Sequence, residues 1–270
     1  LSPYRVQIPM HHPLYLKKDN ESLDEYAKRS AKELEDKILD IGPENVAGFV
    51  GETIMGGLVG DVPPAPNYWK YIREICDKYD VHLILDEVYC GTGSSGKYYC
   101  CDWDNVKPDF IFIGKTLAAG YGALNAIITS SEIEDVIKNG QGRLQHTTTH
   151  QGHSLSVAAA LAVQKIVSDD VFLTNVDTLG QYMRRTLVDE LGDLSIFRDV
   201  RGRGLRLSFE YETGNNVNFS QKISDRMLNN HNILISAKWH RVCFTPPLIL
   251  TKEETDKVLE TFIKEIKLSL

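Results

Sequence analysis

Apolar positions along the first two thirds of the chain alternate between helical spacing and short unbroken runs of strand length. From Ser22 to Ile41 they recur three and four residues apart, and Gly42 and Pro43 follow, which predicts a helix that ends there. Strands separated by helices of about a dozen residues are typical of βαβ units and of a mostly parallel sheet covered on both faces. The predicted strands are 46–53, 81–85, 109–113 and 124–129, and the predicted helices are 22–41, 68–79, 155–167 and 171–191.

The pattern changes after residue 191, where short strands and two helices no longer alternate regularly. This arrangement predicts a smaller α+β domain. No Gly/Ser linker marks a boundary, so we expect the division inside the long helical region, with a large domain over residues 1–165 and a small domain over 166–270. The predicted strands of the small domain are 195–200, 205–211, 233–235 and 242–245, and its helices are 220–230 and 252–267.

The composition and charge of the chain argue against nucleic acid and membranes as binding partners. The 270 residues contain 42% hydrophobic and 25% charged residues, and the formal net charge is −7, which gives no basic footprint for nucleic acid or an anionic membrane. The longest apolar stretch, Val157 to Val163, is far shorter than the roughly 18 residues of a membrane span. We therefore expect a small-molecule partner and a cytoplasmic protein.

The cysteines point to the same kind of compartment. The chain has five, an odd number, and none of them forms a CxxC pair. This argues against a disulfide framework and against a cysteine zinc site, so reduced thiols and no bound metal are expected.

Two polar side chains follow apolar strand runs, which is where ligands bind in open parallel sheets. Asp86 follows the run HLIL, and Lys115 follows the run DFIFI and a glycine. An acid and an amine can therefore face one crevice from neighbouring strands. For an acid and an amine considered by themselves, an ion pair at a sheet edge is the more common explanation.

The surrounding sequence favours a ligand-binding crevice that Asp86 and Lys115 share. The segments LILDEVYCGTG and DFIFIGKTLAAGYGA resemble the signature of the class III aminotransferases, which are fold-type-I enzymes that depend on pyridoxal 5'-phosphate. The resemblance extends over nearly the whole chain. It includes Gly51-Glu52-Thr53 with the helix that follows, HTTTHQG at 146–152, RGRGL at 201–205 and TPPLILT at 245–251.

The resemblance implies a role for three residues near the two strand ends. Lys115 would form the Schiff base with the cofactor aldehyde and then act as the general base that moves a proton between substrate and cofactor carbons. Asp86 would pair with the pyridine nitrogen and keep it protonated, so that the ring remains an electron sink. Val88 would pack on the ring.

The resemblance also implies contacts to the phosphate and the substrate. Thr149 would give its hydroxyl to the cofactor phosphate, in this family usually across a dimer interface, which implies a homodimer with the active site at the interface. Glu52 resembles the glutamate that in some members pairs with the arginine that binds a substrate carboxylate. Arg241 is the candidate for that arginine.

The implied fold is a fold-type-I large domain with a mostly parallel sheet, incomplete at its N-terminus, followed by the smaller α+β domain. Family members carry an upstream portion with a Gly-Ser/Thr phosphate loop, so we expect this chain alone to hold the cofactor less well. Ser94 or Ser95 replaces the usual arginine, and Thr53 replaces the usual proline, which indicates a divergent subgroup.

The implied activity is transfer of an amino group between an amine or amino acid and a keto acid or aldehyde. An aminomutase or a decarboxylase of the same fold would use the same Lys115 and Asp86. A non-catalytic fragment of a longer or two-chain aminotransferase is a further alternative. The sequence does not identify the amino donor, the acceptor or the stereochemistry.

Other motifs have simpler interpretations. Residues 91–97 match GxxxxGK, but Tyr98 stands where a nucleotide-binding loop needs a hydroxyl for Mg²⁺. The intervening threonines and Gly152 predict a loop around His146, His150 and His153 rather than a metal-binding helix. For His11 and His12, an active-site mouth and a plain surface position both stay open.

Overall fold

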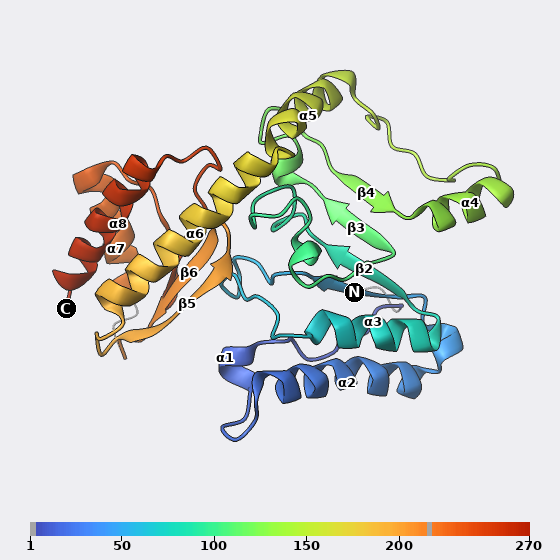
Figure 1. Ribbon diagram of the computed structural model, residues 1–270, viewed down its shortest axis with the longest axis horizontal. Coiled ribbons are helices and arrows are strands. Elements are labelled where there is room, and N and C mark those ends of the chain that lie inside the picture. The colour runs from blue at the N-terminus through green and yellow to red at the C-terminus, as the bar shows by residue number, and fades with distance from the viewer. Residues whose placement is uncertain (1–3, 215–217) are drawn as a thin grey trace. The chain divides into compact units, whose positions relative to one another are not determined.

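The computed structural model describes residues 4–214 and 218–270 (Figure 1). The described chain divides into two compact units. Unit 1 contains the residues up to 53 together with 64–89 and 100–164, and unit 2 contains 54–63, 90–99 and 165–270. Unit 2 thus includes two short segments from the first half of the chain, and the division at residues 165 and 166 stays a prediction.

Unit 1 is built on a four-stranded sheet in the order β1-β2-β3-β4. The first three strands are parallel and β4 is antiparallel to β3, which confirms the mostly parallel sheet. Only a short 3₁₀ turn and a loop connect β3 to β4, and a connection without a crossover helix joins antiparallel strands. The strands are β1 (Gly48–Glu52), β2 (His82–Asp86), β3 (Phe110–Ile113) and β4 (Ala126–Thr129).

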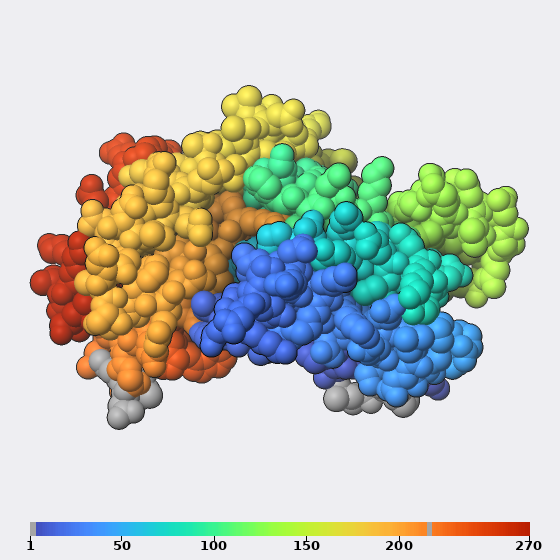
Figure 2. Space-filling model, turned by 60° about the horizontal axis from the view of Figure 1, so that its bottom comes forward, coloured from blue at the N-terminus to red at the C-terminus, as the bar shows by residue number. Residues whose placement is uncertain are grey.

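Local chemistry explains where α2 begins and ends, whereas α1 and α4 were not predicted. Ser22 and Glu25 form a capping box at the start of α2, and the Gly42 amide caps its end by donating to the Ile38 carbonyl. Figures 1 and 2 show α2 and α3 side by side, and the Lys78 ammonium on α3 contacts the Glu35 carboxylate on α2 at 2.7 Å. The helices are α1 (Pro13–Leu16), α2 (Leu23–Ile41), α3 (Tyr68–Tyr79), α4 (Ser131–Asn139) and α5 (Ser154–Val167), the last of which continues into unit 2.

The two faces of this sheet differ. Side chains alternate across a strand, so Leu83 and Leu85 share the face that packs on α3, and both are fully buried. On the opposite face, Val50 and Ile127 remain 54% and 65% exposed. We call this second face the bare face. The expectation of helices on both faces is therefore not met within unit 1.

Unit 2 is an antiparallel sheet in the order β5-β6-β8-β7, packed with three helices around one hydrophobic core. The core includes Phe209, Phe244 and Phe262, whose rings meet edge to face. The elements are β5 (Phe197–Arg203), β6 (Arg206–Tyr211), β7 (Ser236–Lys238), β8 (Arg241–Phe244), α6 (Asp170–Leu191), α7 (Phe219–His231) and α8 (Lys252–Lys267).

The strand predicted over 233–235 is wrong. Asn232 adopts a left-handed conformation that ends α7, and the Ile233 amide donates back to the Met227 carbonyl. Because that amide caps the helix, strand pairing starts only at Ser236, in β7.

Two further expectations concern the whole chain. Within 4–214 and 218–270, no helix combines the length and the apolar character that crossing a bilayer requires. Each of the five cysteines is a buried free thiol.

Candidate functional site

Asp86 and Lys115 leave the sheet at the same edge. Asp86 is the last residue of β2, and its Cα partner on the parallel strand β3 is Phe112, three residues before Lys115. The Asp86 Oδ1 accepts a hydrogen bond from the Val88 amide at 3.0 Å. This bond turns the chain sharply after the strand and keeps the carboxylate at the strand end.

Glu52 occupies the corresponding position on the neighbouring strand. It is the last residue of β1 and is paired in register with Asp86. By strand alternation both residues belong to the bare face, together with Val50 and Ile127. Two carboxylates therefore sit at the carboxyl edge of the sheet on the face that no helix of unit 1 covers.

Lys115 is held in an unusual backbone conformation. Its φ is +43°, in the left-handed region that is costly for a residue with a Cβ. The preceding Gly114 is buried, and a Cβ added there would lie 3.3 Å from Val88 Cγ1. Val88 therefore packs directly against the turn that carries the lysine. The Lys115 ammonium lies 5.7 Å from the centre of the Tyr89 ring.

A buried carboxylate next to Asp86 holds the surrounding segments together. Glu87 is fully buried, and its carboxylate accepts hydrogen bonds from the Thr53 hydroxyl at 2.9 Å and from the Cys100 and Cys101 amides at 2.6 and 2.7 Å. Burial raises the pKa of the Glu87 carboxyl, and these hydrogen bonds oppose the rise. Sequence reasoning missed this role. The signal was available, since strand alternation puts the residue after Asp86 on the opposite, covered side.

Thr149 lies in a segment that makes few contacts. Residues 140–155 are exposed and 140–153 form neither helix nor strand, so the loop predicted around His146, His150 and His153 is confirmed. The His150 and His153 rings are 6.3 Å apart, and no group of three or more metal-ligating side chains occurs among the described residues.

Arg241 belongs to unit 2, where its guanidinium is engaged with main-chain oxygens. Its Nη1 donates to the Val59 carbonyl at 3.1 Å and its Nη2 to the Leu58 carbonyl at 2.7 Å. Arg201 donates to the Gly60 and Val59 carbonyls at 2.6 and 3.0 Å. The two arginines together anchor the loop 54–63 that follows Glu52 in the chain.

The glycine-rich segment 91–97 packs tightly inside unit 2. A Cβ on Gly96 would lie 2.7 Å from Asp177 Cβ on α6, and the Leu205 amide donates to the Ser94 carbonyl at 3.1 Å. These glycines allow close packing against a helix, which argues against the nucleotide-binding interpretation.

The structure decides the environment of the two N-terminal histidines, which are both buried. The His11 ring stacks on Tyr68 at 3.8 Å between ring centres, accepts from the Ala65 amide at Nε2 and donates from Nδ1 to the Ser30 hydroxyl. Burial lowers the pKa of His11 to about 3, with a smaller contribution from His12. His11 is a structural residue of unit 1.

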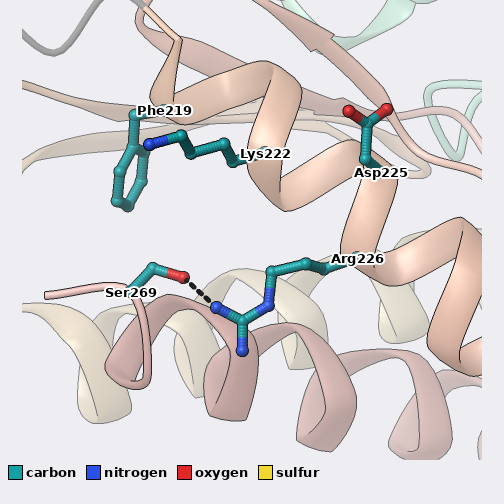
Figure 3. Close-up of a pocket in the computed structure, with 5 residues that line it drawn as sticks. All are labelled: Phe219, Lys222, Asp225, Arg226 and Ser269. Atoms are coloured by element: carbon teal, nitrogen blue, oxygen red, sulfur yellow. Dashed lines mark hydrogen bonds between the residues drawn. The ribbon is translucent and has the colours of Figure 1, made fainter.

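A hollow between α7 and the end of α8 lies in unit 2 (Figure 3). Arg226 donates to the Ser269 hydroxyl at 3.0 Å and pairs with the Glu265 carboxylate at 2.5 Å. Phe219, Lys222 and Asp225 also line this hollow (Figure 3). None of the predicted site residues lines this hollow.

Solved structures define the fold class. The omega transaminase from Pseudomonas jessenii in complex with PMP superimposes with a TM-score of 0.87 at 29% identity, over 97% of this chain and 60% of that chain. The fold is thus that of the pyridoxal-phosphate-dependent transaminases.

The chain belongs to the class III aminotransferase family, whose model "Aminotransferase class-III" matches residues 3–266. It is 38% identical over 195 residues to an aminotransferase of Gibberella zeae, covering 72% of this chain and 38% of the relative. It is 34% identical to gamma aminobutyrate transaminase 2 of Solanum lycopersicum, covering 98% of this chain and 60% of that relative. The chain therefore spans less than two thirds of the length of either relative.

The residues at the sheet edge fit the cofactor on which this family depends. An amine, a carboxylate and a branched aliphatic side chain are the groups that an aldehyde, a pyridine nitrogen and a ring face require. Lys115, Asp86 and Val88 carry groups of these kinds at or just after the ends of two adjacent parallel strands, and a side chain at position 114, next to Lys115, would crowd Val88.

Proposed function

We propose that this protein takes part in pyridoxal-phosphate-dependent transamination between an amine or amino acid and a keto acid or aldehyde. The observation that carries the proposal is the pairing of β2 with β3, which brings the strand end of Asp86 beside the strand that leads into Lys115. When bound, the cofactor supplies a ring that withdraws electrons from the carbon bearing the amino group.

The chain's own residues would perform three tasks. Lys115 Nζ would hold the cofactor through its aldehyde carbon, with release of water, and, once the substrate amine has displaced it, would carry the proton between the substrate carbon and the cofactor carbon. The Asp86 carboxylate accepts a hydrogen bond from the ring nitrogen and keeps that nitrogen protonated. Val88 packs on one ring face, and Gly114 leaves the space in which Val88 lies.

We further propose that Thr149 binds the phosphate, and that Glu52 and Arg241 act on the substrate side. The assignment of Glu52 is supported by its pairing in register with Asp86, which puts the two carboxylates at the same sheet edge. For Arg241, the contacts with the Leu58 and Val59 carbonyls support an indirect role through the loop that follows Glu52.

We propose a homodimer in which Thr149 reaches the partner's site. The support is the exposure of the segment around Thr149 and of Leu155 and Leu161 on the following helix, at 75% and 60%. Light scattering after size-exclusion chromatography should give twice the chain mass, and a single-chain mass at micromolar concentration would contradict the dimer. A cytoplasmic location stays a prediction, supported by the five free thiols.

The exposed apolar side chains of the bare face favour the alternative that this chain is one part of a longer or two-chain aminotransferase. Val50 and Ile127, on the two edge strands of the sheet, are exposed on the face that carries Asp86, and exposed apolar side chains on a sheet face are typical of contact with other protein. Nothing in the arrangement of Lys115 and Asp86 separates transamination from an aminomutase or decarboxylase reaction.

The test is covalent attachment of pyridoxal phosphate to one lysine. We expect borohydride reduction of the protein with the cofactor to label the peptide containing Lys115, and Lys115→Ala to abolish that label. Lys97→Arg, in the glycine-rich segment of unit 2, is the matched control and should leave it unchanged. A label elsewhere in the wild-type protein would contradict the assignment of Lys115.

Asp86 is tested at the proton-transfer step. Asp86→Asn should retain the covalent attachment but slow exchange of the substrate α-proton by about 100-fold or more, because the neutral amide no longer keeps the ring nitrogen protonated. Asp80→Asn, at the end of α3, changes the same functional group away from the site. Exchange in Asp86→Asn at the wild-type rate would exclude this role.

A further inference from the structure

The turn that carries Lys115 is strained at both ends. Lys115 and Ala119 have φ values of +43° and +48°, and neither is glycine. The Ala119 amide donates to the Lys115 carbonyl at 3.0 Å, which closes the turn on itself. A left-handed conformation at a residue with a Cβ persists only where the surrounding structure enforces it.

A side chain from a distant part of the sequence contacts the middle of this turn. The Gln164 side chain on α5 donates from Nε2 to the Leu117 carbonyl at 2.8 Å and lies 3.4 Å from the Thr116 carbonyl. A carbonyl oxygen can only accept, so the group that faces both must be the amide NH₂. Leu117 and Ala118, in the middle of the turn, are 7% and 0% exposed, so water has little access to this part of the turn.

We propose that Gln164 is a positioning residue that braces the turn 115–119 and so holds the Lys115 main chain in its left-handed conformation. The reactive role of Lys115 rests on the proposed function; the brace itself rests on these contacts.

The chemistry explains why a brace is needed at this position. Glycine would relieve the strain, but the proposed reaction needs an amine, so the residue must carry a side chain. On one side of the lysine, Val88 leaves no free space for a side chain at position 114, and on the other side the Leu117 carbonyl accepts the hydrogen bond from Gln164. Relaxation of the turn would move the lysine side chain away from the position that the strand ends define.

The test compares glycine and alanine at position 115 in two backgrounds. With Gln164 present, the unfolding equilibrium constant of Lys115→Gly should be on the order of tenfold smaller than that of Lys115→Ala, because glycine adopts positive φ without strain. With Gln164→Met, which keeps the side-chain length and removes the donor, the turn can relax and this ratio should fall towards one. The measurement is urea denaturation of the full chain, which needs no cofactor.

Gln181→Met is the matched control, because Gln181 lies on α6 and its side chain bonds only Asp177 among the contacts described. It should leave the tenfold ratio intact. The proposal is overturned if glycine does not stabilise position 115 in the wild-type background, or if the ratio stays tenfold in Gln164→Met.

A second readout links the brace to the amine. With Lys115 intact, Gln164→Met should slow borohydride-trapped attachment of pyridoxal phosphate at Lys115 by about tenfold, while Gln181→Met reacts at the wild-type rate. An unchanged rate in Gln164→Met would overturn the positioning role. If the wild-type protein forms no attachment at all, the proposed function fails, and the stability comparison still decides whether the brace exists.

Discussion

The two sheets of this protein bury their faces differently. In unit 2, β6 carries Phe209 and Tyr211 at 0% and 1% exposure, and three helices enclose the core around them. In unit 1, Leu85 on β2 is fully buried on one face, whereas Val50 on the neighbouring strand is 54% exposed on the other.

The charged residues of the two units also differ in where they lie. In unit 2 the buried Arg201 pairs with the buried Glu210 and with main-chain carbonyls, so its charge is used to hold a loop in place. In unit 1, Glu52 and Asp86 lie at strand ends on the bare face. The antiparallel sheet of unit 2 thus uses buried charges to hold its own chain together, whereas the parallel sheet of unit 1 places its strand-end carboxylates on a face where apolar side chains are also exposed.

Truncating an apolar side chain should destabilise the protein far more in the unit 2 core than on the bare face of unit 1. Phe262→Ala in unit 2 should lower the free energy of unfolding by about 3–5 kcal/mol, because it leaves a cavity among packed rings. Ile127→Ala on the bare face should change it by no more than about 0.5 kcal/mol. Urea denaturation measures both. Equal losses would mean that other protein covers the bare face under the conditions of the experiment.

The next effect concerns the buried ion pair of unit 2. Arg201→Met should destabilise the fold by about 3 kcal/mol, because it leaves the Glu210 carboxylate buried without its closest cation. Arg201→Met with Glu210→Leu should recover most of that loss, since an apolar pair can replace a buried ion pair. If the double variant is as unstable as the single one, the role of Arg201 lies in the loop 54–63 and not in the pair.

The smallest effect is a pH dependence that belongs to unit 1. The pKa of His11 is lowered from 6.5 to about 3, so the unfolded chain takes up a proton before the folded chain does as the pH falls. The contribution of neutral His11 to the free energy of unfolding is complete above pH 6.5. It falls by about 1 kcal/mol for each pH unit as the pH drops from 6 to 4. Urea denaturation at several pH values should show that the free energy of unfolding of His11→Gln changes less with pH than that of the wild type. His153→Gln, at an exposed histidine, should keep the wild-type slope.

Local signals were sufficient for most of the secondary structure. Ser22 and Gly42 delimit α2, and the predicted helix 68–79 agrees with α3, because capping and apolar spacing act over a few residues. The strand predicted at 233–235 failed because one amide, that of Ile233, is used by the end of α7. A competition for a single hydrogen bond leaves no trace in an apolar pattern.

The candidate site shows the same limit. Asp86 and Lys115 could be selected because each follows an apolar run and lies in a motif that resembles the family signature. The buried side of Glu87 could be read from strand alternation, but its hydrogen-bond partners could not, and Gln164 could not be selected at all, since an isolated glutamine in a helix carries no distinctive spacing. Their contacts join segments that are far apart in the chain.

Most of the helices and strands, the family resemblance and the choice of Asp86 and Lys115 as candidate site residues follow from the sequence itself, because they depend on short-range periodicity and on the chemistry of individual residues. Only the folded chain decides that one sheet face stays uncovered, that Lys115 takes a left-handed backbone, and that Arg241 contacts two carbonyl groups. These features depend on which distant segments meet and which donors they leave to one another, and a linear pattern of residues does not contain that information.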